Sequence, residues 1–95
     1  MRPAAAALAA LPLAAACALP PEGTTEADRA AYDAAVASVG CTLAAEADYA
    51  PVELQTGLTR QQIMDISRYR VAQERAVRTP EGGVRLTAGA CAPDA

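Results

Sequence analysis

The spacing of apolar residues predicts a helix over 25–39. Small and apolar side chains recur there every three or four positions, which places them on one face of a helix. That stripe consists of Ala31, Tyr32, Ala35, Val36 and Val39. Thr25 and Asp28 have the spacing of a capping box at the start of this helix, and Gly40 is a favourable residue just beyond its end.

A short second helix is predicted over 51–56. Pro51 suits the first position of a helix, where the missing N–H is not needed. Gly57 can end the helix, because glycine readily adopts the left-handed conformation of a helix end.

A longer third helix is predicted over 59–74, with Thr59 and Gln62 as its capping box. Its apolar arc consists of Ile63, Met64, Ile66 and Val71. Arg70 falls within the same arc, and a lone buried guanidinium is costly. We therefore expect Arg70 either to extend into solvent or to pair with Glu53 or Asp48.

Two short strands follow, over 76–78 and 84–87. The residues between them, 79–83, include Pro80 and two glycines, which are typical of a turn. Val84 and Leu86 would face one side of the hairpin and Arg85 the other, because side chains alternate along a strand.

The order of these elements over 26–87 resembles that of a winged helix-turn-helix. The resemblance implies that the third helix and the hairpin form a nucleic-acid-binding face. The arginines on these two elements are Arg60, Arg68, Arg70, Arg75, Arg78 and Arg85. A plain small α+β protein is the equal alternative.

The first 18 residues have the pattern of a signal peptide. A basic start at Arg2 is followed by an uncharged, mostly Ala and Leu run and a small-residue end. This run is shorter than the roughly 20 apolar residues that span a bilayer. Ala16 and Ala18 form an A-x-A site, so cleavage after Ala18 is one outcome.

The same region also resembles the lipobox of bacterial lipoprotein precursors. Ala14-Ala15-Ala16-Cys17 carries the resemblance, although Leu13 stands four residues before the cysteine, where the pattern has leucine three before. The resemblance implies cleavage before Cys17 and a diacylglycerol thioether on its sulfur. The stretch 19–25, rich in Pro, Gly and Thr, then has the composition of a linker.

Three cysteines are present, and either route of cleavage removes or modifies Cys17. Cys41 and Cys91 remain, and in an oxidising compartment they form the one possible intramolecular pair. The predicted fold is therefore α+β: a small domain over 26–92, with about three helices and a C-terminal β-hairpin, stapled by one disulfide.

Composition excludes several activities. The chain contains no His, Lys, Asn, Phe or Trp. Without His there is no Ser-His or Cys-His pair and no imidazole metal ligand. With Tyr as the one aromatic type, base stacking is not expected. No nucleophile has a base to activate it, so we expect no enzyme, no catalytic residues, no cofactor and no metal site.

Charge is divided between the two halves of the chain. Residues 19–53 carry seven acidic side chains and one Arg, a net charge of −6, and residues 54–95 carry six Arg and four acidic side chains, a net charge of +2. Because the total from residue 19 onward is −4, we expect no nucleic-acid binding. Arg60, Arg68 and Arg75 are the candidate partner-binding residues, since arginines also suit carboxylates. Arg68 and Arg75, seven apart, would lie close to one line on the third helix.

The sequence thus predicts a protein of the periplasm or cell envelope that binds another envelope protein. It would be held at the membrane by a lipid on Cys17, or otherwise be secreted. The alternative is a cytoplasmic winged-helix protein that binds nucleic acid.

Overall fold

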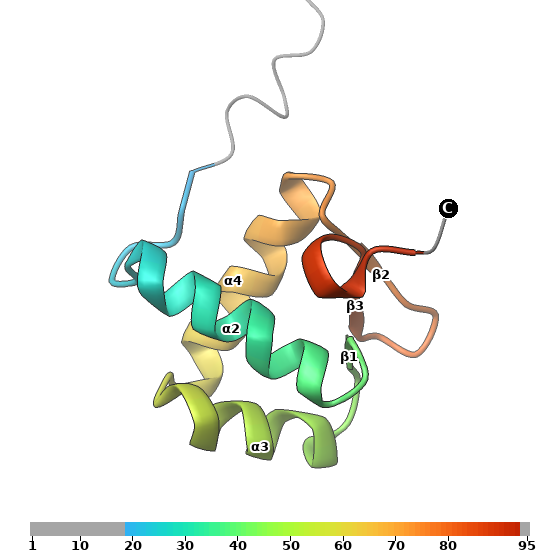
Figure 1. The fold of residues 1–95 in the computed structure, drawn as a ribbon, viewed down its shortest axis with the longest axis horizontal. Helices are drawn as coiled ribbons and strands as arrows, with labels where there is room; N and C mark the ends of the chain where they lie inside the picture. Colours follow the sequence, from blue (N-terminus) through green and yellow to red (C-terminus); the bar gives the residue numbers. More distant parts are fainter. Residues whose placement is uncertain (1–18, 94–95) are drawn as a thin grey trace, which may run out of the picture.

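The computed structural model describes residues 19–93, and these form an α+β domain of three helices and a three-stranded antiparallel sheet (Figure 1). In chain order the elements are α2 (Glu26–Ser38), β1 (Thr42–Leu43), α3 (Glu46–Thr56), α4 (Arg60–Ala72), β2 (Ala76–Arg78), β3 (Val84–Leu86) and the 3₁₀ helix η2 (Gly89–Cys91). The predicted fold class is confirmed. The predicted leader, 1–18, and Cys17 lie outside the described residues.

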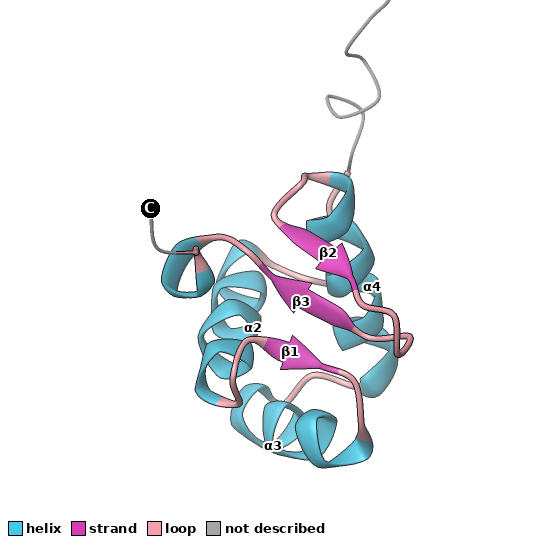
Figure 2. Ribbon diagram, turned by 90° about the vertical axis from the view of Figure 1, so that its right-hand side faces the viewer, coloured by secondary structure: helices cyan, strands magenta, loops and turns pink. Residues whose placement is uncertain are grey.

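The sheet has the order β1-β3-β2, with the predicted hairpin of β2 and β3 joined by a strand that the sequence did not reveal (Figure 2). In β1, Thr42 pairs with Arg85 and Leu43 with Val84. Two residues are too few to show an alternating pattern. Gly83 makes this pairing possible, because a Cβ at its position would lie 2.3 Å from the carbonyl oxygen of Leu43.

The capping boxes predicted for α2 and α4 are both present. The Thr25 hydroxyl accepts a hydrogen bond from the Asp28 N–H at 3.0 Å, and the Asp28 carboxylate accepts one from the Thr25 N–H at 2.9 Å. Thr59 and Gln62 make the same reciprocal pair at 3.0 and 2.9 Å. These bonds satisfy N–H groups that have no partner inside a helix. Residues close together in the sequence therefore determine where α2 and α4 begin.

The prediction that the second helix begins at Pro51 is wrong, because α3 begins five residues earlier, at Glu46. Asp48 provides the start signal: its carboxylate accepts hydrogen bonds from the N–H groups of Ala44 and Ala45 at 2.9 and 3.0 Å. Pro51 lies inside the helix, where it removes one backbone hydrogen bond. The predicted end is correct, since Gly57 adopts the left-handed conformation with φ 72°.

Helices α2 and α4 end with the same backbone motif. After α2, the N–H of Gly40 donates to the Ala37 carbonyl and the N–H of Cys41 to the Val36 carbonyl, which is a Schellman motif. After α4, Glu74 occupies the position that Gly40 holds after α2, and it adopts the left-handed conformation with φ 64°. The third helix therefore ends at Ala72, two residues before the predicted 74, and the chain turns away there.

The core lies where the three helices meet the sheet. Its fully buried side chains are Tyr32, Val36, Leu43, Val52, Ile63 and Ile66. Met64 was predicted to join them but is 38% exposed. Ser67 and Arg70 are buried on α4 instead, so this helix presents a partly polar face to its neighbours.

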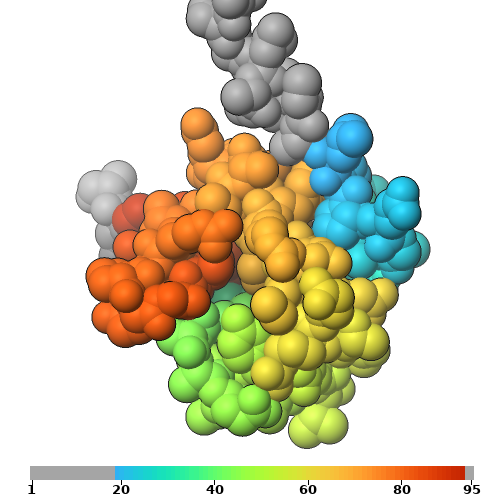
Figure 3. Space-filling model, turned by 180° about the vertical axis from the view of Figure 1, so that it is seen from behind, coloured from blue at the N-terminus to red at the C-terminus, as the bar shows by residue number. Residues whose placement is uncertain are grey.

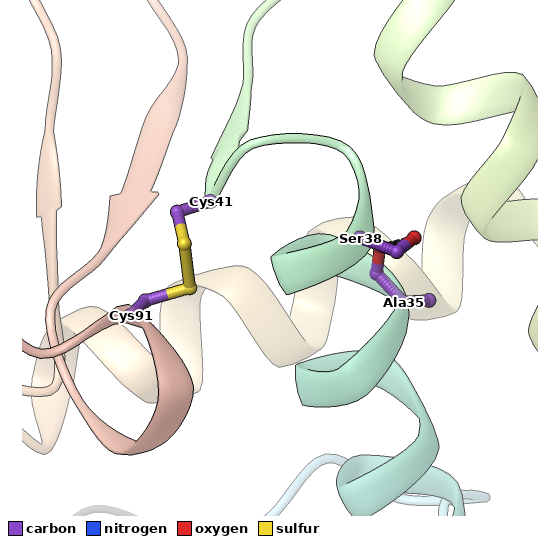
Figure 4. The surroundings of a disulfide bond; sticks show 4 residues. All are labelled: Ala35, Ser38, Cys41 and Cys91. Atoms are coloured by element: carbon purple, nitrogen blue, oxygen red, sulfur yellow. Dashed lines mark hydrogen bonds between the residues drawn. A yellow bond between two sulfur atoms is a disulfide. The ribbon is translucent and has the colours of Figure 1, made fainter.

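The predicted disulfide between Cys41 and Cys91 is present (Figure 4). The two Cα atoms are 5.7 Å apart, in the usual range for a disulfide. Figure 4 shows the bond between the turn after α2 and the 3₁₀ helix η2. It thus attaches the C-terminal segment to the end of the first helix.

Residues 19–25, whose composition predicted a linker, are held against the domain. Gln62 Nε2 donates to the Gly23 carbonyl at 3.4 Å. Arg29 Nη1 donates to the Thr24 carbonyl at 2.9 Å and to its hydroxyl at 3.0 Å. Thr24 in turn closes a local turn onto Pro21. The C-terminal part of this segment is therefore bonded to α2 and α4, whereas Leu19 and Pro20 are exposed.

Candidate functional site

Arg60 begins α4 and is occupied by two carboxylates of α3. Its Nη2 donates to both Glu46 oxygens at 3.0 and 2.9 Å, and its Nε donates to Glu53. The guanidinium also lies over the Tyr49 ring, 4.4 Å from its centroid. The hydrogen bonds to Glu46 and then to Glu53 raise the pKa of Arg60, and the bond from Arg60 lowers the pKa of Glu46.

Arg70, the arginine expected within the apolar arc, is buried and paired with a different acid from those predicted. Its Nε and Nη2 donate to the two Asp33 oxygens at 3.0 and 2.8 Å, and its Nη1 donates to Gln73 Oε1 at 2.7 Å. Glu53 pairs with Arg60 instead, and Asp48 caps α3. The correction follows from packing, because α2 lies against α4 and carries Asp33 on the facing side.

Arg68 lies on the exposed side of α4 and has a local partner. Its Nη1 donates to Asp65 Oδ1 at 2.7 Å, one turn earlier on the same helix. The two side chains are 52% and 38% exposed, so the pair is weak and can open toward a binding partner.

Arg75 lies beyond the end of α4, so the prediction that it continues the line of Arg68 is wrong. Its N–H donates to the Arg70 carbonyl at 2.8 Å, and its own carbonyl accepts from the Thr87 N–H at 2.9 Å. Within residues 19–93 its side chain has no ion pair. Arg75 borders a cleft of about 230 Å³, and the other charged residues that line this cleft are Asp33 and Arg70.

The three candidate residues consequently do not form one patch. Arg60 lies at the first residue of α4, Arg68 near its middle and Arg75 past its end. A helix of 13 residues is about 20 Å long, which separates the two outer residues. The spacing of these residues in the sequence already implies most of this separation, but not the turn after Ala72 that takes Arg75 off the helix, because Glu74 and not a glycine holds the left-handed position there.

A small hollow joins α4, α3 and the hairpin, with a volume of about 90 Å³. Figure 3 views the face on which these three elements come together. Its lining residues are Tyr49, Met64, Ser67, Arg68, Arg78, Gly82 and Val84. Arg78 is exposed and has no ion pair within the described part of the chain.

This hollow is lined by both apolar and positively charged side chains. Met64 and Val84 offer the apolar surface, and Arg68 and Arg78 can donate hydrogen bonds to carboxylates. The sequence identified Arg68 and Arg78 as members of a basic face but missed Tyr49. That tyrosine reaches the hollow because α3 begins before Pro51, and the sequence pattern did not indicate this.

Within residues 19–93, no group of three or more His, Cys, Asp or Glu is placed to hold a metal ion. The helices of that same region are all too short or too polar to cross a bilayer. Comparisons of the chain with protein-family models, with curated proteins and with solved structures find no match.

Proposed function

We propose that this chain is a small exported protein of the cell envelope, anchored by a lipid on Cys17, whose domain binds another envelope protein. The observation that carries the proposal is the disulfide between Cys41 and Cys91. Disulfides persist in oxidising compartments outside the cytoplasm, and they are common in small secreted domains whose cores are limited. The leader pattern over 1–18 agrees with that compartment.

The hollow beside Met64 is the proposed contact with the partner. A side chain with an acidic end and an apolar body would contact Met64 and accept hydrogen bonds from Arg68 and Arg78. The partner surface is therefore acidic, with at least one apolar anchor. Arg85 serves as the matched control, because it is exposed on the sheet and does not line the hollow.

Localisation and the mass of the processed chain test the first part of this proposal. The native protein is expected in the membrane fraction, with a mass that equals residues 17–95 plus a lipid increment, and Cys17→Ser is expected to release it. A full-length chain without lipid in the cytoplasm would contradict export. A released chain that begins at Leu19 would support export without a lipid anchor.

Crosslinking in intact cells tests the second part. A photoreactive residue at Met64 is expected to trap a defined protein, and Arg78→Glu is expected to reduce the yield several-fold, whereas Arg85→Glu leaves it unchanged. Equal yields in the two charge variants would contradict the proposed contact.

The alternative, a nucleic-acid-binding winged helix, is favoured by one observation. The three helices α2, α3 and α4 are followed by the hairpin of β2 and β3, which is the element order on which the winged-helix resemblance rests. Against it, Arg60 is held by the carboxylates of Glu46 and Glu53, and the charge from residue 19 onward is −4. Affinity for duplex DNA in the micromolar range that falls steeply with salt would favour this alternative.

A further inference from the structure

Leu19, the first described residue, lies against α4. It borders a broad, shallow hollow of about 400 Å³ together with Arg68, Tyr69 and Ala72 of that helix. The side chain of Leu19 is 79% exposed, so it presents an apolar surface to the outside. The hydrogen bonds from Gln62 and Arg29 attach residues 23 and 24 to the domain, and Thr24 closes a turn back onto Pro21.

The distance from this point to the proposed anchor is short. Cys17 precedes Leu19 by two residues, and two residues of chain span at most about 7 Å even when fully extended. Lipoproteins with a long disordered linker can turn freely above the membrane. This chain has no such freedom, because the fold begins almost directly after the anchored residue.

We propose that the end of the domain formed by Leu19 and the last turns of α4 lies against the surface of the lipid bilayer. The inference rests on the proposed function, since it requires a lipid on Cys17. It goes further by fixing which side of the domain meets the membrane. Leu19 and Pro20, both exposed, then reach the level of the lipid headgroups.

The opposite end of the domain faces away from the membrane. Figures 1 and 2 place α3 at the far end of the molecule from the segment where the described chain begins. Leu54 of α3 is 85% exposed at that end. Arg60, at the start of α4, is about 20 Å along the helix from Ala72.

The tether, and not charge, sets this orientation. The exposed acidic side chains near this end are those of Glu22, Glu26 and Glu74. Arg75, also near this end, has no ion pair among residues 19–93, and Arg68 is paired with Asp65. A surface without excess positive charge has little attraction for anionic lipids. We therefore expect vesicles with and without anionic lipid to orient the anchored domain in the same way.

Tryptophan fluorescence can measure the orientation, because the chain contains no Trp. The full chain would be produced in a bacterial host that processes it, and reconstituted in phosphatidylcholine vesicles whose headgroups carry a nitroxide quencher. Ala72→Trp and Leu19→Trp place the reporter at the end proposed to meet the membrane. Leu54→Trp, at an equally exposed site on α3, is the matched control.

Quenching is expected to be at least threefold stronger at positions 19 and 72 than at position 54. Ten Gly and Ser residues inserted between Ala18 and Leu19 have a root-mean-square span of about 17 Å, so the insertion should bring the three positions toward equal quenching. Equal quenching without the insertion, in protein whose Cys17 is shown by mass to be acylated, would overturn the orientation alone. An unacylated Cys17 would overturn both this inference and the lipid anchor.

Discussion

The hydroxyl of Tyr32 lies 2.6 Å from Oγ of Ser67 in the centre of the core, and this contact joins α2 to α4. Ser67 has a single hydroxyl proton, which it donates to the Ile63 carbonyl at 2.9 Å. Tyr32 is therefore the donor in the contact between the two hydroxyls. Burial raises the pKa of Tyr32 to about 12, so the hydroxyl keeps this proton even at an alkaline pH at which a free tyrosine ionises.

Removing either hydroxyl is expected to have unequal effects. Ser67→Ala leaves the Tyr32 hydroxyl buried without an acceptor, which should cost about 1–3 kcal/mol. Tyr32→Phe leaves Ser67 still bonded to Ile63, so it should cost only about 1 kcal/mol. In the double variant the loss should be smaller than the sum, and urea unfolding of the three variants measures it. Strict additivity would show that the hydroxyls do not interact.

Reduction of the disulfide should destabilise the domain strongly. Cys41 and Cys91 are 50 residues apart in sequence, and in the chain-entropy model a loop of that length contributes about 4 kcal/mol. For a domain of this size the loss should lower Tm by roughly 15 °C or more. Melting curves with and without reductant measure it. The double variant Cys41→Ser with Cys91→Ser should melt like the reduced protein under both conditions, whereas equal melting of oxidised and reduced wild type would contradict the prediction.

The parts of the fold that were predictable depend on neighbours in sequence. The starts of α2 and α4 are set by side chains three residues apart, and the hairpin by its turn. The start of α3 was missed because Ala45, at the cap position, has no side-chain acceptor. Asp48 makes the cap from inside the helix, and Pro51 suggested a start that lies too late.

The candidate site was less predictable, because it depends on how helices cross. Arg70 and Asp33 are 37 residues apart, and no spacing rule connects them. The hollow beside Met64 combines residues from α3, α4 and the hairpin, so it exists only after all three have packed. Sequence could identify arginines in the second half of the chain, but not which of them are paired.

Glu74→Gly is expected to stabilise the protein. Glu74 holds the left-handed position at the end of α4, where a residue with a Cβ is strained and glycine is not. The substitution should raise the free energy of unfolding by roughly 0.5–1 kcal/mol, after the greater entropy of glycine in the unfolded chain is included. Glu74→Ala keeps the strain and should leave stability close to that of wild type. Thermal melts of the two variants separate these outcomes.

Stability should fall in acid, and Asp48 contributes to this loss. Hydrogen bonds from the N–H groups of Ala44 and Ala45 lower the pKa of Asp48 in the folded protein. A carboxyl whose pKa is lowered by folding stabilises the protein above its unfolded pKa, near 3.9, and this contribution is lost as pH falls through the folded pKa. Asp48→Asn should therefore lower stability at pH 7 and flatten its dependence on pH below about 4. Urea titrations at several pH values measure the slope, and an unchanged slope in the variant would contradict this role.

The Arg70–Asp33 pair should behave differently from the exposed Arg68–Asp65 pair. The side chain of Arg70 is 10% exposed, and Asp33→Asn would leave its guanidinium without a counter-charge. Breaking a fully buried pair in this way costs about 3–5 kcal/mol. Because the side chain of Asp33 is 36% exposed, water can compensate in part, and we expect a loss of about 1–2 kcal/mol.

Two further variants separate charge from packing in this pair. Arg70→Met with Asp33→Ala removes both charges and fills the space along α4 with an apolar chain. It should therefore be more stable than Asp33→Asn alone, since replacing a buried pair by apolar groups is often neutral. Asp65→Asn, which breaks the exposed pair, should change stability by less than about 0.5 kcal/mol. Chemical unfolding of these variants at low and high salt gives the comparison. If Asp33→Asn and Asp65→Asn had equal effects, the contact between α2 and α4 would depend on the apolar core and not on the buried guanidinium.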